Sequence, residues 1–291
     1  MSDLAEHHSL VKELFVEASD ILGVDLWDMS QNGPIENLSQ TENTQPALLT
    51  AGVAAWRVWQ SLDGKAPAMM AGHSLGEYTA LVNAGALKFA DGVALVRDRG
   101  RYMQDAVPAG EGGMAAILGL EDDKVREVCA QAAQGDVLQA VNFNAPGQVV
   151  IAGSATAIAR GIVQLKAAGA RRAIALPVSI PAHSSLMSSA SARLAERIDS
   201  IDIVMPKIPV VHNCNVQIAD STDQIAANLV TQLDSPVRWV ESIQAMHQQG
   251  VNSFIESGPG RVLGGMIKRI VKDVSIACIE KADSYATLIE T

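Results

Sequence analysis

The five residues Gly72-His73-Ser74-Leu75-Gly76 carry the strongest chemical signal in the sequence, because they fit the pattern G-x-S-x-G. In this pattern a serine sits on a sharp turn between a buried strand and a helix, which exposes its hydroxyl. An apolar run at 66–71 precedes the motif and a helical pattern at 76–86 follows it. We therefore predict that Ser74 is a nucleophile and that the backbone N–H of Leu75 stabilises an oxyanion.

A serine nucleophile needs a base, and the chain has six histidines. Four of them are typical of solvated or packed side chains, namely His7, His8, His73 and His212. His183 and His247 remain equal candidates on residue type alone, because the fold and not the spacing brings a base to its serine. A hydrolase that combines Ser74 with His247 and an aspartate such as Asp234 therefore stays open as an alternative.

The wider motif Gly-His-Ser-Leu-Gly-Glu-Tyr (72–78) resembles the active-site motif of the malonyl-CoA:acyl carrier protein transacylases of bacterial type II fatty-acid synthesis. The resemblance continues in order through Thr44-Gln45-Pro46-Ala47, Arg99-Gly100, Asn142-Phe143-Asn144, Pro181-Ala182-His183, Gln232-Leu233 and Gly258-Pro259-Gly260. The strand and the Gly-Gln-Gly-Ser-Gln loop with which the family opens are lacking. That loop supplies a second oxyanion donor, so we expect a longer natural protein and impaired catalysis in this form.

The resemblance selects His183 as the base and implies roles for four more residues. Gln232 matches the Gln or Asn whose carbonyl orients the histidine. Arg99 matches the arginine that holds the free malonyl carboxylate, which a planar guanidinium can do through two parallel hydrogen bonds. Gln45 and Asn144 match substrate-binding positions. A surface ion pair is the alternative for Arg99, and an ordinary polar helix end is the alternative for Gln232.

The reaction that the resemblance implies passes a malonyl group from malonyl-CoA to Ser74, and from there to the phosphopantetheine thiol of acyl carrier protein, for fatty-acid elongation. Coenzyme A enters as a substrate thioester, and we expect no metal, no bound cofactor and a monomeric enzyme. A non-catalytic module that binds carrier protein or coenzyme A is a further alternative. Carrier protein is acidic in this family, so its docking site is expected among the densest basic clusters, which are Arg171-Arg172, Lys268-Arg269 and Arg261. Scattered solubility charges are the alternative for these clusters.

The elements that must position these residues follow from the hydrophobic periodicity. We predict helices at 10–18, 46–59, 76–86 and 90–106, with a loop at 28–44. Residues 114–178 follow the order βαββαβ, which is typical of a ferredoxin-like unit. Strands and helices alternate again from 208 to 279. The fold class predicted is α/β: an α/β-hydrolase-like parallel sheet domain of residues 1–107 and 180–291, with an inserted ferredoxin-like subdomain of residues 108–179.

The composition narrows the function classes. A net charge of −10 and a pI of about 5.0 argue against a nucleic-acid partner. The three cysteines, Cys129, Cys214 and Cys278, are too widely spaced for a metal site, so free thiols in a reducing compartment are expected. The polar N-terminus is unlike a signal peptide, and no apolar run is long enough to span a bilayer. We therefore expect a cytoplasmic protein with no membrane partner.

Overall fold

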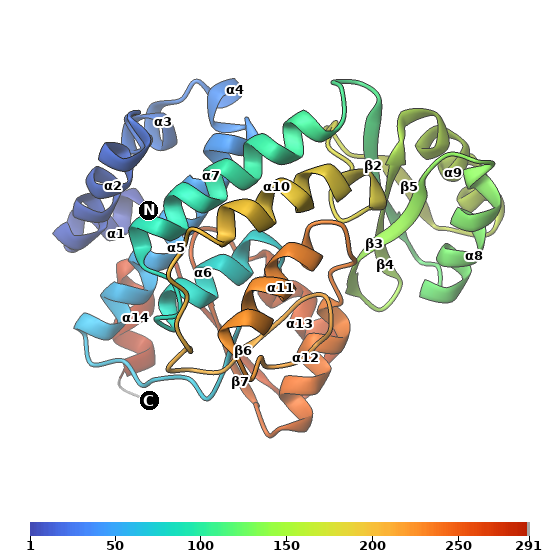
Figure 1. Ribbon diagram of the computed structural model, residues 1–291. Coiled ribbons are helices and arrows are strands. Elements are labelled where there is room, and N and C mark those ends of the chain that lie inside the picture. Colours follow the sequence, from blue (N-terminus) through green and yellow to red (C-terminus); the bar gives the residue numbers. More distant parts are fainter. Residues whose placement is uncertain (290–291) are drawn as a thin grey trace.

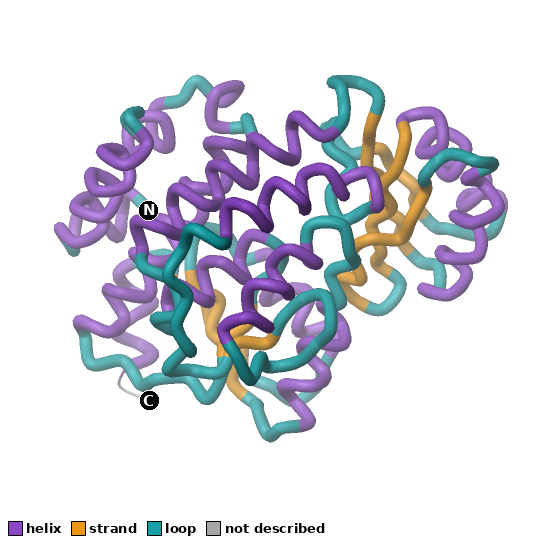
Figure 2. Tube along the Cα trace, in the orientation of Figure 1, coloured by secondary structure: helices purple, strands orange, loops and turns teal. Residues whose placement is uncertain are grey.

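The computed structural model describes residues 1–289 and consists of a larger part, which contains both termini, and a smaller part at one side of it (Figure 1). Helices dominate the larger part, whereas the smaller part is built around a sheet (Figure 2). Both parts contribute residues to the surroundings of Ser74.

The smaller part is a four-stranded antiparallel sheet with strand order β3-β4-β2-β5. In chain order its elements are β2 Gly112–Leu118, α8 Asp122–Ala133, β3 Leu138–Ala145, β4 Gln148–Ser154, α9 Ala155–Ala167 and β5 Arg172–Ala175. This is the βαββαβ order expected for a ferredoxin-like unit. The unit lies within the range 108–179 that the sequence assigned to the small subdomain.

The apolar run of β4 reflects burial on both faces of this sheet. Val149 and Ile151 pack in one cluster with residues of α8 and α9, whereas Val150 packs in a separate cluster that includes Met114 and Val141. The larger part also adds a parallel bridge, because the backbone of Val237 bonds to both Val141 and Phe143. Strand β3 is thereby tied to the larger part.

The larger part contains two parallel strand pairs, β1–β6 and β7–β8. Its first segment comprises α1 Ser2–His7, α2 Ser9–Leu22, α3 Leu26–Asn32, α4 Ile35–Leu38, α5 Thr41–Ser61, β1 Met70–Ala71, α6 Leu75–Asn83 and α7 Phe89–Ala106. The chain returns after the smaller part with η1 Ser185–Met187, α10 Ser188–Ile198, β6 Val210–Val211, α11 Thr222–Gln232, α12 Trp239–Gln248, β7 Ser253–Ser257, α13 Val262–Ile270, β8 Ser275–Ile279 and α14 Ala282–Ile289.

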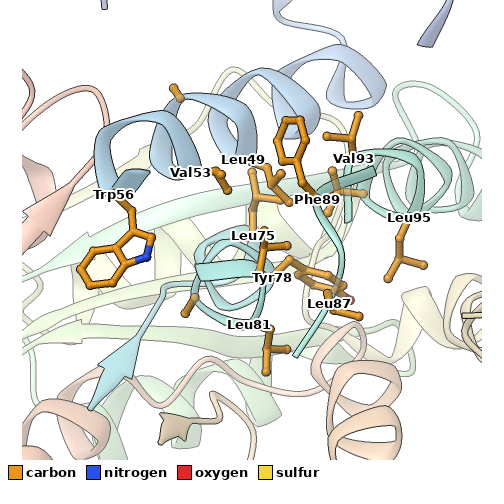
Figure 3. Packing of buried hydrophobic residues seen from close by; sticks show 14 of the residues in the cluster. Leu49, Val53, Trp56, Leu75, Tyr78, Leu81, Leu87, Phe89, Val93 and Leu95 are labelled. Carbon is orange, nitrogen blue, oxygen red and sulfur yellow. The ribbon is translucent and has the colours of Figure 1, made fainter. Parts of the chain in front are cut away.

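The main core lies between α5, α6 and α7. Figure 3 shows Leu75 and Tyr78 of α6 next to Leu49 of α5 and Val93 of α7. All four side chains are buried. Complete burial of one such side chain stabilises the fold by about 1.5–3 kcal/mol. The start of α6, immediately after Ser74, is therefore firmly held.

Two predictions about the helices were wrong. Residues 28–44 contain helical segments and not a loop. Polar side chains satisfy some of the helix ends: Asp25 Oδ1 accepts from the backbone N–H of Asp28 over 2.8 Å, and Asn43 Nδ2 donates to the Asn37 carbonyl over 2.9 Å. Helix α5 starts at Thr41, and Pro46 lies inside it and does not open it. Helix α10 was missed, although Ala190, Leu194 and Ile198 repeat every four residues and are buried.

The predicted fold class is confirmed: the larger part combines parallel strand pairs with helices, and an antiparallel βαββαβ unit is inserted into its chain. Strand β1 is shorter than the apolar run 66–71 suggests, because only Met70 and Ala71 pair with β6. Among residues 1–289, none of the helices combines the length and the apolar character needed to cross a membrane.

Candidate active site

Ser74 occupies the turn between β1 and α6 in a conformation that is rare for a residue with a side chain, with φ 51° and ψ −108°. Such a conformation costs on the order of 1–3 kcal/mol and persists only where the surroundings enforce it. Asn213 enforces it here by bonding to both sides of the turn. Its Oδ1 accepts from the Ser74 N–H over 2.7 Å, and its Nδ2 donates to the Gly72 carbonyl over 2.7 Å.

The two glycines of the motif do different things. A Cβ on Gly72 would lie 1.9 Å from the carbonyl carbon of Gly76, so no larger residue fits there without moving the backbone of α6. A Cβ on Gly76 would meet nothing within 4 Å. The close approach of β1 to α6 therefore requires glycine at position 72 and leaves open space at position 76.

The base predicted for Ser74 lies in hydrogen-bond contact with it. Ser74 Oγ and His183 Nε2 are 2.8 Å apart. His183 Nδ1 lies 2.8 Å from the backbone carbonyl of Gln232 and donates to it, which leaves Nε2 free to accept the serine proton. Like Ser74, His183 has a positive φ, of 64°. Ser74, His183 and the Gln232 carbonyl therefore have the geometry that a nucleophile, a base and an orienting acceptor require.

The acceptor for His183 is the main chain of Gln232 and not its side chain. Gln232 is the last residue of α11, where carbonyl groups have no helical donor and the helix carries partial negative charge. That end of α11 stabilises an imidazolium more than an isolated amide would. Burial, and after it the charge of Arg99, lowers the pKa of His183 to about 3, so the ring is neutral and able to accept a proton at neutral pH.

Arg99 lies beside Ser74 and is almost completely buried, with 1% of its surface exposed. Its Nη2 is 3.1 Å from Ser74 Oγ and 3.0 Å from Gln232 Oε1, and its Nη1 is 2.6 Å from Gln45 Oε1. Its Nε has no hydrogen-bond partner among the described residues. Burial lowers the pKa of Arg99 from its ordinary value. A buried guanidinium with one unused N–H is suited to bind an anionic group next to Ser74.

Gln45 and Asn144, the two other predicted binding residues, are both buried. Gln45 contacts Arg99, as described above, and its Nε2 donates to Thr41 Oγ1 over 2.9 Å. Asn144 belongs to β3, and its Oδ1 lies 2.7 Å from Nε2 of His73, the residue before the nucleophile. Asn144 therefore joins the smaller part to the serine turn, and Gln45 joins α5 to the guanidinium.

Leu75, the predicted oxyanion donor, is the first residue of α6. The backbone N–H at this position of a helix has no helical acceptor and lies at the positive end of the helix dipole. The alternative base, His247, is directed elsewhere, because its Nδ1 bonds to the carbonyl of Val251 at 3.0 Å. The structure thus pairs Ser74 with His183 and does not assemble the alternative set with Asp234.

Two buried residues of this region were missed from the sequence, Glu77 and Asn213. Glu77 is in the first turn of α6 with no exposed surface, and its Oε1 lies 2.6 Å from His212 Nδ1. The sequence contained one signal for Glu77, because this charged residue stands in α6 between residues that are buried. The partners lie more than 130 residues further along the chain, so no local pattern could have identified them.

The chain is similar in sequence to known acyltransferases. Residues 12–288 match the acyl transferase domain family. The malonyl CoA-acyl carrier protein transacylase of Escherichia coli (strain K12) is 50% identical over 290 residues, which cover 100% of this chain and 94% of that protein.

Two solved structures are closely similar. The malonyl CoA-acyl carrier protein transacylase of Coxiella burnetii aligns with a TM-score of 0.98 and 46% identity over 99% of this chain and 92% of that one. A malonyl-transacylase in complex with its holo type II PKS acyl-carrier protein aligns with a TM-score of 0.98 and 49% identity over 99% of this chain and 94% of that one.

Proposed function

Because the chain belongs to the acyl transferase family of malonyl-CoA–acyl carrier protein transacylases, we propose that it moves a malonyl group from malonyl-CoA to acyl carrier protein through an ester on Ser74. One observation carries the proposal: Arg99 Nη2 and His183 Nε2 both lie within hydrogen-bond distance of Ser74 Oγ, at 3.1 and 2.8 Å. A nucleophile, a base and a binding group for a carboxylate therefore share one point in space.

In the first half-reaction Ser74 Oγ attacks the thioester carbonyl of malonyl-CoA, and its proton passes to His183 Nε2. The oxyanion that forms accepts from the backbone N–H of Leu75, where a preorganised donor is most effective. The C–S bond then breaks, the proton moves from His183 to the sulfur, and coenzyme A leaves. The products are free coenzyme A and a malonyl ester on Ser74.

In the second half-reaction the phosphopantetheine thiol of acyl carrier protein attacks that ester. His183 takes the thiol proton, the C–O bond breaks, and the proton returns to Ser74 Oγ. The enzyme is regenerated without any redox change, and none of these steps requires a metal or a bound cofactor. The malonyl thioester that forms supplies fatty-acid chain elongation.

Arg99 selects the acyl group in this proposal. The carboxylate of a malonyl group replaces part of the hydrogen bonding that Gln45, Gln232 and Ser74 now provide to the guanidinium. An acetyl group brings no such charge and leaves Nε of Arg99 without a hydrogen-bond partner among the described residues. A buried polar group that only the correct substrate satisfies is an effective basis for discrimination.

We place carrier-protein docking at the basic residues beside the β3–β4 turn. Arg269 bonds to the Pro146 carbonyl in that turn, over 2.7 Å. Arg171 lies against Gly119, whose N–H donates to the Gly147 carbonyl over 2.8 Å. Arg261 has its own partner, because it pairs with Glu280 at 2.9 Å. Arg171 and Arg172 are exposed and are therefore the better candidates. We also propose that the enzyme is monomeric and cytoplasmic.

The second half-reaction provides the test. Enzyme loaded with malonyl-CoA is freed of coenzyme A and mixed with holo acyl carrier protein, and both proteins are weighed by mass spectrometry. The proposal expects the malonyl mass to leave the enzyme and to appear on the carrier protein. Release of free malonate, with an unmodified carrier protein, would instead support a hydrolase.

A further inference from the structure

Glu77 is a buried carboxylate, and both of its oxygens bond to other groups of the protein. Its side chain has no exposed surface. Oε1 lies 2.6 Å from His212 Nδ1, and Oε2 accepts from the Asn213 backbone N–H over 2.9 Å and from Gln232 Nε2 over 2.8 Å. A carboxylate that accepts several hydrogen bonds at the start of a helix is in a favourable place for negative charge. The chemistry proposed above does not use Glu77 directly.

The side chain of Gln232 connects Glu77 to the site. Its Nε2 donates to Glu77 Oε2 and, over 3.0 Å, to the carbonyl of Ser74. Its Oε1 accepts from Arg99 Nη2 over 3.0 Å. One amide thus touches the residue that selects the acyl group and the main chain of the nucleophile.

The carboxylate of Glu77 decides which way this amide points. An amide rotated by half a turn would place its oxygen against the Glu77 carboxylate and the Ser74 carbonyl, and its NH₂ against the guanidinium. Each of those contacts would join two acceptors or two donors. With Glu77 in place, Gln232 Oε1 can only face Arg99, which holds the guanidinium beside Ser74 Oγ.

We propose that Glu77 and the side-chain amide of Gln232 form a positioning unit that aims Arg99 at the carboxylate of the acyl group bound next to Ser74. This inference rests on the proposed malonyl transfer. It separates two roles of Gln232: its main-chain carbonyl orients His183, whereas its side chain orients Arg99. The unit affects the choice between acyl groups more than it affects the serine–histidine pair.

The test replaces the side-chain amide of Gln232 and keeps its main-chain carbonyl. In Gln232→Leu the main-chain acceptor of His183 remains, so acetylation of Ser74 by acetyl-CoA should fall less than malonylation. The malonyl-to-acetyl ratio should fall by about 10- to 150-fold, the effect expected for one hydrogen bond to a charged group. Rates are expressed per titrated Ser74, so that misfolded molecules do not count. Gln224→Leu on the same helix, where the side chain bonds to the Asp220 N–H, is the matched control and should keep the wild-type ratio.

A further variant tests the rest of the unit. Glu77→Asp keeps the charge but withdraws it by one methylene, so it should lower the malonyl-to-acetyl ratio in the wild-type background. In the Gln232→Leu background it should have no further effect on that ratio, because the two residues act together.

The outcomes separate the alternatives. A purely structural role predicts a loss of titratable Ser74 with an unchanged malonyl-to-acetyl ratio, and that result overturns the inference. A ratio that Glu77→Asp lowers equally in both backgrounds also overturns it. If the wild type forms no malonyl-serine, the proposed function and the inference are both overturned. If the wild type is malonylated and the variants keep its malonyl-to-acetyl ratio, the inference alone is overturned.

Discussion

Arg99 Nη2 lies 3.1 Å from Ser74 Oγ, so the group that we propose to select the acyl chain also touches the nucleophile. The same serine oxygen is 2.8 Å from His183 Nε2. In the free protein Ser74 therefore donates to the base and accepts from the guanidinium. A substrate carboxylate that draws Arg99 towards itself removes this second contact at the moment when the serine must attack.

Replacement of the guanidinium tests this relationship. Arg99→Ala should lower malonylation of Ser74 by about 10- to 150-fold, which corresponds to the loss of a hydrogen bond to a charged group worth about 1.5–3 kcal/mol. Acetylation should fall much less. Stopped-flow or quenched measurements of coenzyme A release provide both rates. Arg101→Ala is the control. It removes an exposed arginine that pairs with Glu42 and lies two residues after Arg99, and it should change neither rate. Equal losses for both substrates would contradict the assignment of Arg99.

The pH dependence of acylation follows from the environment of His183. Burial and the charge of Arg99 lower its pKa to about 3, and the base works only in its neutral form. As the pH falls, a histidine with the ordinary pKa of about 6.5 would become protonated and the rate would drop tenfold by roughly pH 5.5. With the lowered pKa, kcat/KM for malonyl-CoA should instead stay level from about pH 8 to pH 5. An acidic limb centred near 6.5 would show that the ring is more hydrated than the structure indicates.

The glycines of the serine turn should respond in opposite ways to the same substitution. Gly72→Ala forces a Cβ to within 1.9 Å of the Gly76 carbonyl carbon, so the melting temperature should fall sharply or the protein should fail to fold. Gly76→Ala adds a methyl group into open space near the start of α6, where alanine favours the helix over glycine by up to about 1 kcal/mol. Its melting temperature should be equal to or above that of the wild type. Similar losses in both variants, measured by calorimetry, would refute this reading of the turn.

Much of this site could be predicted from the sequence, because the serine turn is local. A strand, five motif residues and a helix follow one another, and together they identify Ser74 and Leu75. The base could not be identified in this way. His183 and His247 were equal candidates on residue type, and the choice depended on the resemblance to a family. The fold brings His183 to Ser74 from 109 residues away.

Sequence patterns could not predict those parts of the site in which the main chain and the side chain of one residue play different roles. Gln232 could be predicted as an acceptor for the base, but no pattern tells that its carbonyl serves His183 while its amide serves Arg99. Glu77 and Asn213 were missed because their partners lie more than 130 residues away in the sequence. In the fold, residues 28–44 were misjudged because polar residues and glycines are common in loops and at helix ends alike.

Reversal of charge tests the docking proposal. Arg171→Glu combined with Arg172→Glu should slow transfer from malonyl-Ser74 to holo acyl carrier protein, mainly through a higher KM for the carrier, because like charges then face each other. Acylation by malonyl-CoA should be unaffected. The effect should weaken as salt is added, since exposed charges are screened. Lys88→Glu is the control, because it reverses an exposed charge at the start of α7 in the larger part. Equal loss of both half-reactions in the double variant would contradict docking at this site.

The most direct test of the account is the mass of the intact protein after brief incubation with malonyl-CoA, with acetyl-CoA and Ser74→Ala protein alongside. We predict one malonyl adduct on the wild type, a much weaker adduct with acetyl-CoA, and none on the variant. That result would establish the nucleophile, the covalent intermediate and the selection of a carboxylate together. An adduct that persists in Ser74→Ala, or coenzyme A release without any adduct on the wild type, would contradict acyl transfer through Ser74.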